Sequence, residues 1–185
     1  MVNAWYMDDS NADQKLEHHL NPPQFISIKE LYENCGVIYY QLDADNYDAE
    51  GKLEKIKKDK GYNYEDEIQL SRNKLPDYEE KLKIFYKEHL HSDEEVRFFL
   101  DGSGYFDVRD KNDKWVRIQS EKGDLLVLPA GIYHRFTLDT NNYAKVIRFF
   151  SGEPCWKPNN RPSDDHPARQ KYLKQLAEGF HECPL

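Results

Sequence analysis

Hydrophobic positions near the start of the chain recur at helical spacing. The apolar side chains that fall on one helical face are Ile28, Leu31, Tyr32 and Cys35. Ser27 and Glu30 form a capping-box pattern at the start of this stretch, and Gly36 stands where a helix would end. The pattern therefore predicts a helix between Ser27 and Gly36, followed by a strand over 37–42.

The stretch 47–60 is strongly charged but also has a helical repeat. Leu53 and Ile56 lie on one side, and lysines alternate with acidic residues over the rest. Mixed charges of this kind indicate a solvated helix face and not a binding patch. Pro76 opens a further short stretch with helical signals, so the region before the middle of the chain is expected to be mostly helical.

From about residue 85 the pattern changes to short apolar runs separated by turn residues. The expected strands are Glu95–Leu100, Tyr105–Arg109, Trp115–Gln119, Asp124–Leu128, His134–Leu138 and Lys145–Phe150. The sequence Asp-Gly-Ser-Gly at 101–104 predicts a hairpin turn between the first two. The last apolar repeat, at 168–179, predicts a short terminal helix.

These elements predict a mainly β protein with an antiparallel β-barrel or sandwich as its core. We expect a single domain over residues 1–185, with its barrel core at about 83–151. The helical additions are expected at about 27–80, on the N-terminal side, and at 168–179, at the C-terminus. No internal repeat or low-complexity linker divides the chain.

Composition and charge narrow the possible partners. The chain carries 26 Lys and Arg against 34 Asp and Glu, a net charge of −8, which disfavours nucleic acid and anionic membranes. Aromatic residues make up 14% of the chain, more than a disordered segment carries. Three widely spaced cysteines form no CxxC pair, and no signal peptide or apolar span is evident. We therefore expect a soluble intracellular protein.

Histidine provides the most informative pattern. His89 and His91 lie two residues apart, so on a strand both would face the same side, and Glu95 follows after a short turn. His134 comes after a strand and a Pro-Ala-Gly turn, which would bring it back across the barrel. Imidazoles with one carboxylate suit a first-row divalent metal ion better than calcium.

Either segment alone could be a metal-free surface strand, but the two together resemble both motifs of the cupin superfamily. The positions that match besides the four possible ligands are Gly102, Gly123, Pro129 and Gly131. The motif's leading glycine is replaced by Lys83 and its final asparagine by Leu138. Both departures lie outside the ligand set. The resemblance implies a cupin-type double-stranded β-helix with a bound metal.

Longer stretches resemble the acireductone dioxygenase family over almost the whole chain. They are Ala4–Met7, Leu42–Asp45, Glu88–His91, Asp101–Arg109, Leu128–Phe136 and Gly152–Pro154. The resemblance is weaker beyond Asn160. It implies one Fe(II) or Ni(II) per chain, held by His89, His91, Glu95 and His134, and an enzyme of methionine salvage that cleaves acireductone (1,2-dihydroxy-5-methylthiopent-1-en-3-one) with dioxygen.

The same resemblance implies different products with the two metals. With Fe(II) they are 4-methylthio-2-oxobutanoate and formate. With Ni(II) they are 3-methylthiopropanoate, formate and carbon monoxide. Eukaryotic members are found in the cytoplasm and nucleus. No apolar surface pattern demands a partner, so we expect a monomer.

Three further residues are candidates for substrate contact. Arg97 lies two residues after Glu95, hence on the same strand face, and could stabilise an enolate oxygen. Without the metal motif, a surface ion pair would be the simpler reading of this arginine. Phe85, on the His89 side by strand alternation, and Phe136 could line an apolar site for the methylthio tail or belong to the core.

The remaining histidines and a cysteine are expected to be incidental. We expect His18 and His19 to be solvent-exposed, and His166 and His181 to have surface roles. Cys155 is expected to pack in the structure and not to act as a nucleophile, because no histidine pairs with it locally.

Two alternatives remain open from the sequence. One is another metal-dependent cupin enzyme, either an isomerase or a different dioxygenase. A zinc-dependent sugar-phosphate isomerase should show several cations around the site, whereas Arg97 is the one that the pattern places facing the ion, with Lys87 less clearly placed. The other is a non-catalytic cupin that binds a small ligand, although all four expected metal ligands are present.

Overall fold

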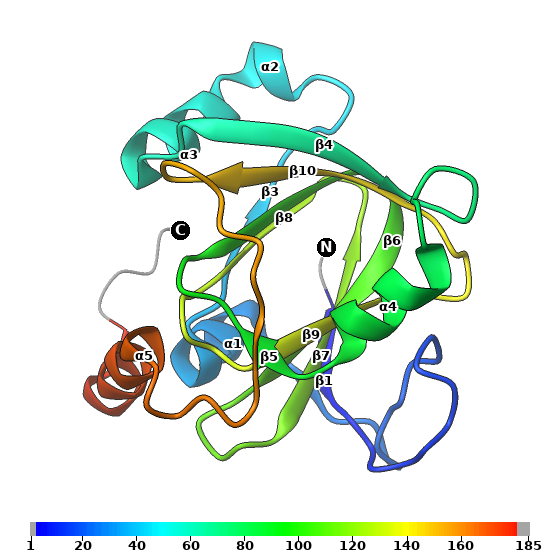
Figure 1. The fold of residues 1–185 in the computed structure, drawn as a ribbon, viewed down its shortest axis with the longest axis vertical. Helices are drawn as coiled ribbons and strands as arrows, with labels where there is room; N and C mark the ends of the chain where they lie inside the picture. Colours follow the sequence, from blue (N-terminus) through cyan, green and yellow to red (C-terminus); the bar gives the residue numbers. More distant parts are fainter. Residues whose placement is uncertain (1–2, 181–185) are drawn as a thin grey trace.

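A computed structural model describes residues 3–180, and within them eleven strands form one antiparallel sheet curled into a barrel (Figure 1). The strands are β1 (Asn3–Tyr6), β2 (Phe25–Ile26), β3 (Ile38–Gln41), β4 (Tyr64–Leu70), β5 (His89–Leu90), β6 (Glu95–Arg109), β7 (Trp115–Glu121), β8 (Asp124–Leu128), β9 (His134–Leu138), β10 (Ala144–Phe150) and β11 (Asn159–Asn160). The helices are α1 (Ile28–Cys35), α2 (Tyr47–Glu50), α3 (Lys52–Lys60), α4 (Tyr78–Tyr86) and α5 (Pro167–Glu178). The expected mainly β class is confirmed.

The long strand β6 joins the two halves of the barrel. Its first part pairs with β8 and β10, and its second part pairs with β7 and β9. Because one strand belongs to both halves, side chains from its start lie close to side chains from β9 and β10. This arrangement creates the interior space in which the candidate site lies.

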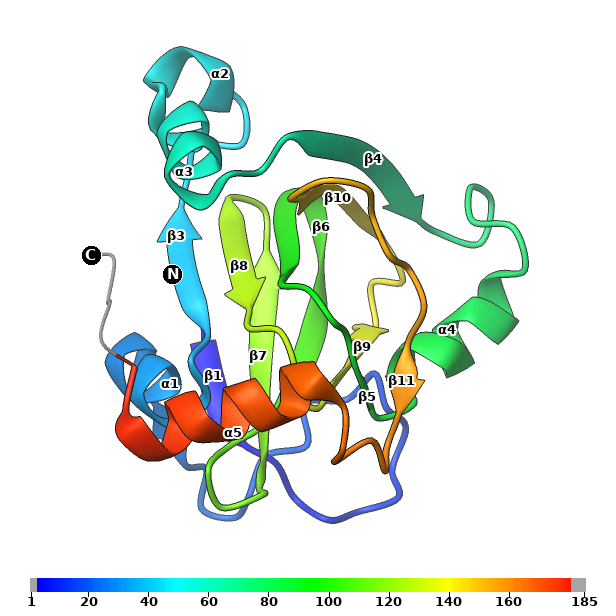
Figure 2. The same ribbon diagram turned by 60° about the vertical axis from the view of Figure 1, so that its left-hand side comes forward.

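Helix α1 forms as its capping signals predict. The Ser27 hydroxyl accepts from the backbone N–H of Glu30, and the Glu30 carboxylate accepts from the backbone N–H of Ser27. Gly36 ends the helix in the left-handed region at φ 75°, a conformation that glycine adopts without a Cβ clash. The buried face of α1 packs on the barrel core, and the Tyr172 hydroxyl of α5 donates to the Cys35 carbonyl at 2.9 Å. Figure 2 shows α5 lying across this end of the barrel beside α1.

Two strands lie within the stretch 27–80 that was expected to be helical. Strand β3 was predicted from its apolar run, but β4 was not, and it pairs along its whole length with β10. Strand β1, which pairs with β7, also precedes the expected barrel core. The sheet therefore begins well before residue 83.

The predicted hairpin at 101–104 is wrong. The chain continues through it as the single strand β6, with a register irregularity against β10 between Lys145 and Val146. Gly102 has φ 72°, and a Cβ there would lie 2.2 Å from the carbonyl oxygen of Tyr143. The glycine permits two strands to approach closely and does not turn the chain.

A buried ion pair ties the N-terminal loop to the barrel. The Arg117 guanidinium is completely buried and donates to the Asp107 carboxylate at 2.7 and 2.9 Å. It also donates to the carbonyls of Gln14 and Leu16 in the loop. Arg135 donates to the same carboxylate, so Asp107 bridges two strands and orders the loop on the barrel surface.

Among residues 3–180, no helix combines the length and the apolar character that crossing a membrane would require.

Candidate metal centre and substrate cavity

Two histidines face each other across neighbouring strands. His89 on β5 is the register partner of His134 on β9, and the centres of their rings lie 4.5 Å apart. Both side chains are buried inside the barrel. The strand pairing thus brings together two residues that are far apart in the sequence.

The backbone orients both rings. Nδ1 of His89 lies 2.6 Å from the carbonyl oxygen of Lys87, and Nδ1 of His134 lies 2.9 Å from that of Ile132. A carbonyl oxygen only accepts hydrogen bonds, so each Nδ1 carries the proton. Nε2 is then the ring nitrogen that can offer a lone pair to an ion.

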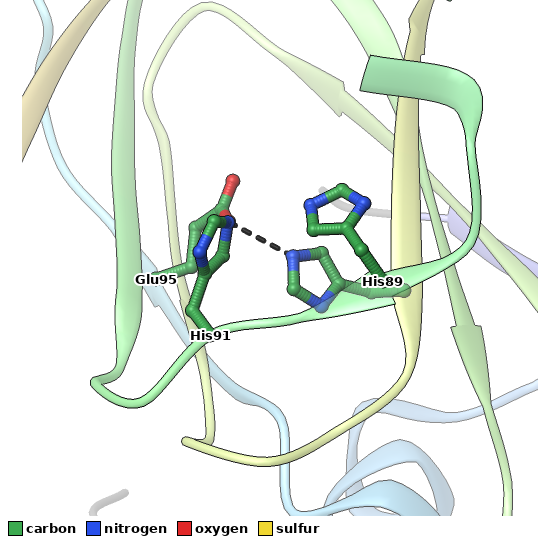
Figure 3. A group of neighbouring side chains, drawn as sticks. His89, His91 and Glu95 are labelled. Atoms are coloured by element: carbon green, nitrogen blue, oxygen red, sulfur yellow. Dashed lines mark hydrogen bonds and ion pairs between the residues drawn. The ribbon is translucent and has the colours of Figure 1, made fainter. Parts of the chain in front are cut away.

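His91, in the loop between β5 and β6, and Glu95, the first residue of β6, complete the group. One carboxylate oxygen of Glu95, Oε2, lies 2.9 Å from Nε2 of His134 and 3.2 Å from Nε2 of His91. Figure 3 shows His89, His91 and Glu95 directed toward one common space. One donor atom from each of the four residues lies within 4.8 Å of the others. The structure therefore brings together all four predicted ligands.

Charge in the group favours a bound cation. Burial would raise the pKa of Glu95, but the Arg97 guanidinium and the adjacent histidines outweigh it and hold that pKa well below its usual range. Burial and the nearby His134 lower the pKa of His89 to about 4. Burial also acts to lower the pKa of His91, yet its hydrogen bond to Glu95 prevails and raises it.

The donor set fits a first-row divalent ion. At neutral pH it offers an ionised carboxylate and neutral His89, with nitrogen and oxygen donors that such ions prefer to the all-oxygen sets of calcium. Nε2 of His91 and Nε2 of His134 both lie close to the same carboxylate oxygen of Glu95. The donors are therefore grouped compactly enough to bind a single cation. These four residues could hold one metal ion.

A cavity of about 70 Å³ opens beside this group, with Arg97 in its wall. The Arg97 Nη2 atom lies 3.2 Å from Glu95 Oε1, and Nη1 donates to the Val96 carbonyl at 2.9 Å. Burial lowers the pKa of Arg97, although Glu95 opposes that shift. The expected orientation of Arg97 toward the site is what the structure shows.

Phe85 and Phe136 both line the same cavity. Their rings meet edge to face, with centroids 6.4 Å apart. The strand-alternation argument for Phe85 is wrong, however, because the residue lies on helix α4 and reaches the cavity from the helix side. The other apolar residues in the wall are Ile68, Leu70, Phe99, Phe106 and Val146.

Comparison with known proteins identifies the family. Residues 3–158 match the sequence profile described as the ARD/ARD′ family. The chain belongs to this family. A protein from Ixodes scapularis named acireductone dioxygenase is 62% identical to it, over 97% of this chain and 99% of that protein. One of the same name from Gallus gallus is 57% identical over 96% and 98%.

A solved structure agrees with the fold. It is an acireductone dioxygenase from Bacillus anthracis with a cadmium ion in its active centre. It matches with a TM-score of 0.68 at 27% identity, over 84% of this chain and 96% of that one. The chain is therefore an enzyme of the ARD/ARD′ family, a metal-dependent acireductone dioxygenase with a cupin fold.

The sequence analysis did not identify a second arginine in the wall of the cavity. Arg148 on β10 is the register partner of Arg97 and lines the same cavity. Asp66 on β4 accepts two hydrogen bonds from it, at 2.8 and 2.6 Å, and its guanidinium lies 3.8 Å from the centre of the Trp156 ring. Strand alternation could have found it, since Val146 and Arg148 share one face of β10.

Several expectations for residues outside the four predicted ligands are wrong. His18 is buried, not exposed, and lies 2.8 Å from both an Asp8 carboxylate oxygen and the Asp13 carbonyl oxygen. His19 is partly buried and packs on Trp5 with centroids 4.4 Å apart.

Two other expectations concern the second half of the chain. His166 is partly buried and caps α5, because its Nδ1 accepts from the Ala168 backbone N–H at 3.1 Å. Cys155 is exposed, so the expected packing role is wrong. It borders a smaller pocket together with Trp156 and His91. His181 lies outside the described residues.

Proposed function

We propose that the chain cleaves acireductone with dioxygen, using one Fe(II) or Ni(II) held by His89, His91, Glu95 and His134. The observation that carries the proposal is the group of four donor atoms beside a mainly apolar cavity with a guanidinium at its edge. Membership of the ARD/ARD′ family supports the same substrate.

A divalent ion bound by these residues would supply Lewis-acid chemistry and a template for the two substrate oxygens. The chain itself does three things. It keeps the ligand set ready, because backbone carbonyls fix the Nδ1 protons of His89 and His134. It keeps Glu95 ionised through Arg97. It limits water in the interior, since His89, His134 and Phe136 are buried and Phe85 is half-buried.

Arg97 is proposed to bind the substrate enolate. Its guanidinium is desolvated and lies at the boundary between Glu95 and the cavity, so a second oxygen anion placed there would find a fixed donor. Such donors stabilise the reacting anion without reorganising. Phe85 and Phe136 are proposed to hold the methylthio tail, since their rings close the apolar side of the cavity.

The metal ion would determine the products. With Fe(II) we propose 4-methylthio-2-oxobutanoate and formate, and with Ni(II) 3-methylthiopropanoate, formate and carbon monoxide. Both sets contain every atom of acireductone and dioxygen, so neither needs another oxidant. This reaction places the enzyme in methionine salvage.

We also propose that the protein acts as a monomer in the cytoplasm and nucleus. The resemblance to eukaryotic family members supports the proposed location. The lack of an apolar surface pattern in the sequence that would demand a partner supports the monomer. Size-exclusion chromatography with light scattering tests the first part, and imaging of the tagged full chain tests the second. A stable dimer, or confinement to another compartment, would contradict the corresponding part.

A sugar-phosphate isomerase fits the cavity less well. Two arginines line the cavity, but the charge of Arg148 is already paired with Asp66. Within residues 3–180, this leaves Arg97, itself beside Glu95, as the one arginine of the cavity wall that can meet an anion, whereas a phosphate group calls for several cations.

The deciding experiment uses protein stripped of metal and reloaded with iron or nickel. Acireductone is added under air, and oxygen uptake and products are followed. We expect substrate loss well above the uncatalysed rate and a product set that changes with the metal. His91→Ala serves as the control and should lower both bound metal and turnover. Substrate loss at the uncatalysed rate with both metals would refute the proposal.

A further inference from the structure

A short strand holds the segment after β10 against the ligand-bearing strand β5. Asn160 pairs with His89 and Asn159 with Leu90, and the backbone N–H of Arg161 donates to the Glu88 carbonyl at 3.1 Å. Figure 2 shows this segment, coloured orange, running from β10 down to β11 beside β5. Two paired residues give little hold by themselves, so other contacts must fix the strand.

Arg161 supplies those contacts through two carboxylates. Its Nη1 donates to Glu88 at 2.9 Å, and its two terminal nitrogens donate to the two oxygens of Asp113 at 2.9 and 3.0 Å. Paired hydrogen bonds of this kind fix a guanidinium in position as well as binding it. Glu88 also accepts from Arg109, at 2.8 and 3.1 Å.

The same guanidinium touches the neighbours of two predicted ligands. Glu88 directly precedes His89 in the chain. The Arg161 guanidinium also lies 4.6 Å from the centre of the Tyr133 ring, and Tyr133 directly precedes His134. One side chain thus connects the outer sides of the two strands whose inner sides carry the facing histidines.

The segment that Arg161 anchors also forms part of the site wall. Between β10 and β11 it carries Cys155 and Trp156, which border a pocket together with His91 and Glu95. The Trp156 ring packs on Phe150, with centroids 4.6 Å apart. Phe150 and Arg148 hold the Trp156 ring at one end, and residues 157–158 between it and β11 form no regular secondary structure. The path of this stretch therefore depends on how firmly β11 is held.

We propose that Arg161 is a positioning residue. It fastens β11 to β5, and it thereby holds in place both the His89–His134 pair and the wall formed by residues 151–158. The inference rests on the proposed function, because it assumes that the four-residue group binds a metal. Arg161 itself touches none of the four.

Arg109 provides a matched comparison. Both arginines donate to the Glu88 carboxylate, and both have partly buried side chains. Only Arg161 belongs to the segment after β10, whereas Arg109 ends β6. If the ion pairs merely stabilise the fold, Arg109→Gln and Arg161→Gln should behave alike. If Arg161 positions the site, they should differ.

The experiment compares these two variants with the parent protein by hydrogen exchange and by Ni(II) binding in competition with a chelator. For Arg161→Gln we expect amide exchange at residues 159–161 to rise about tenfold, and Ni(II) affinity to fall about tenfold, at the low end for residues that support metal ligands. For Arg109→Gln both should stay within about threefold of the parent.

Equal values in the parent and Arg161→Gln, or equal changes in both variants, would overturn the proposal. Should Arg161→Gln fail to fold, Arg161→Lys keeps the charge but not the paired contacts, and the same loss is expected. A parent protein that binds no Ni(II) would contradict the proposed function instead. The exchange measurement would still decide whether Arg161 holds β11.

Discussion

Replacing Arg97 by methionine should slow catalysis without weakening the metal site. The two charged groups lie 3.2 Å apart, between Arg97 Nη2 and Glu95 Oε1. At that separation, two unit charges attract by about 5 kcal/mol before desolvation, with an effective permittivity of about 20. A substrate enolate oxygen beside the same guanidinium would feel an attraction of similar size.

Part of this attraction is already present before the reaction, so the expected change in rate is smaller. Loss of one fixed donor to a developing anion typically lowers kcat by about 10²–10³-fold, and we expect that range for Arg97→Met. The affinity of the same variant for the metal should not fall. Arg97 competes with a cation for the Glu95 carboxylate, so its removal should leave metal binding unchanged or tighter.

The assay measures oxygen uptake under saturating acireductone together with the metal content of each sample. Arg72→Gln, at a surface arginine whose side chain is 72% exposed, controls for the general loss of a positive charge. If kcat of Arg97→Met stays within about threefold of the parent, the enolate role is refuted. A loss of bound metal that parallels the loss of activity would refute the electrostatic reasoning.

Three more predictions concern other parts of the molecule. In Gly104→Ala the new Cβ would lie 2.8 Å from Cζ of Phe136, so the ring must move; we expect a higher KM and about 1–3 kcal/mol lower stability, and unchanged values of both would contradict this contact. Burial acts to lower the pKa of His91, but the hydrogen bond to Glu95 prevails and raises it. Metal-free His91 is therefore protonated at pH 6 and neutral well above its pKa. Ni(II) binding should therefore release about one proton at pH 6 and less at pH 8, measured by calorimetry in two buffers; equal release at both would count against it. Arg117→Met leaves a buried carboxylate without its main partner, and urea unfolding should show a loss of about 3–5 kcal/mol, whereas a loss below about 1 kcal/mol would show that the pair is not needed.

The sequence was sufficient to find the metal group because local geometry carries most of the information. His89 and His91 are close in the chain, Glu95 follows a short turn, and only His134 needed a prediction about strand pairing. The bounds predicted for β8 and β9 are those observed. These strands are buried and bounded by clear turn signals, so their pattern is strong.

What the sequence did not reveal depends on neighbours far along the chain. Strand β4 carries three consecutive acidic residues among its seven, and its pairing with β10 makes it a strand. Arg148 faces the cavity because β10 runs beside β6, and its tie to Asp66 depends on β4. The local pattern around Gly102 predicts a turn, whereas the close approach of the neighbouring strand is what requires a residue without a side chain.

In the two histidines that face each other, the Nδ1 atoms are held by peptide carbonyls, of Lys87 and Ile132. No substitution can delete a carbonyl, so mutation has little access to the basicity of these two ligands. Side-chain substitutions can act more directly through Arg97, which contacts Glu95. An attempt to evolve a variant that accepts only one metal would therefore find few changes that help near His89 and His134. We expect the successful ones to cluster around His91 and Glu95.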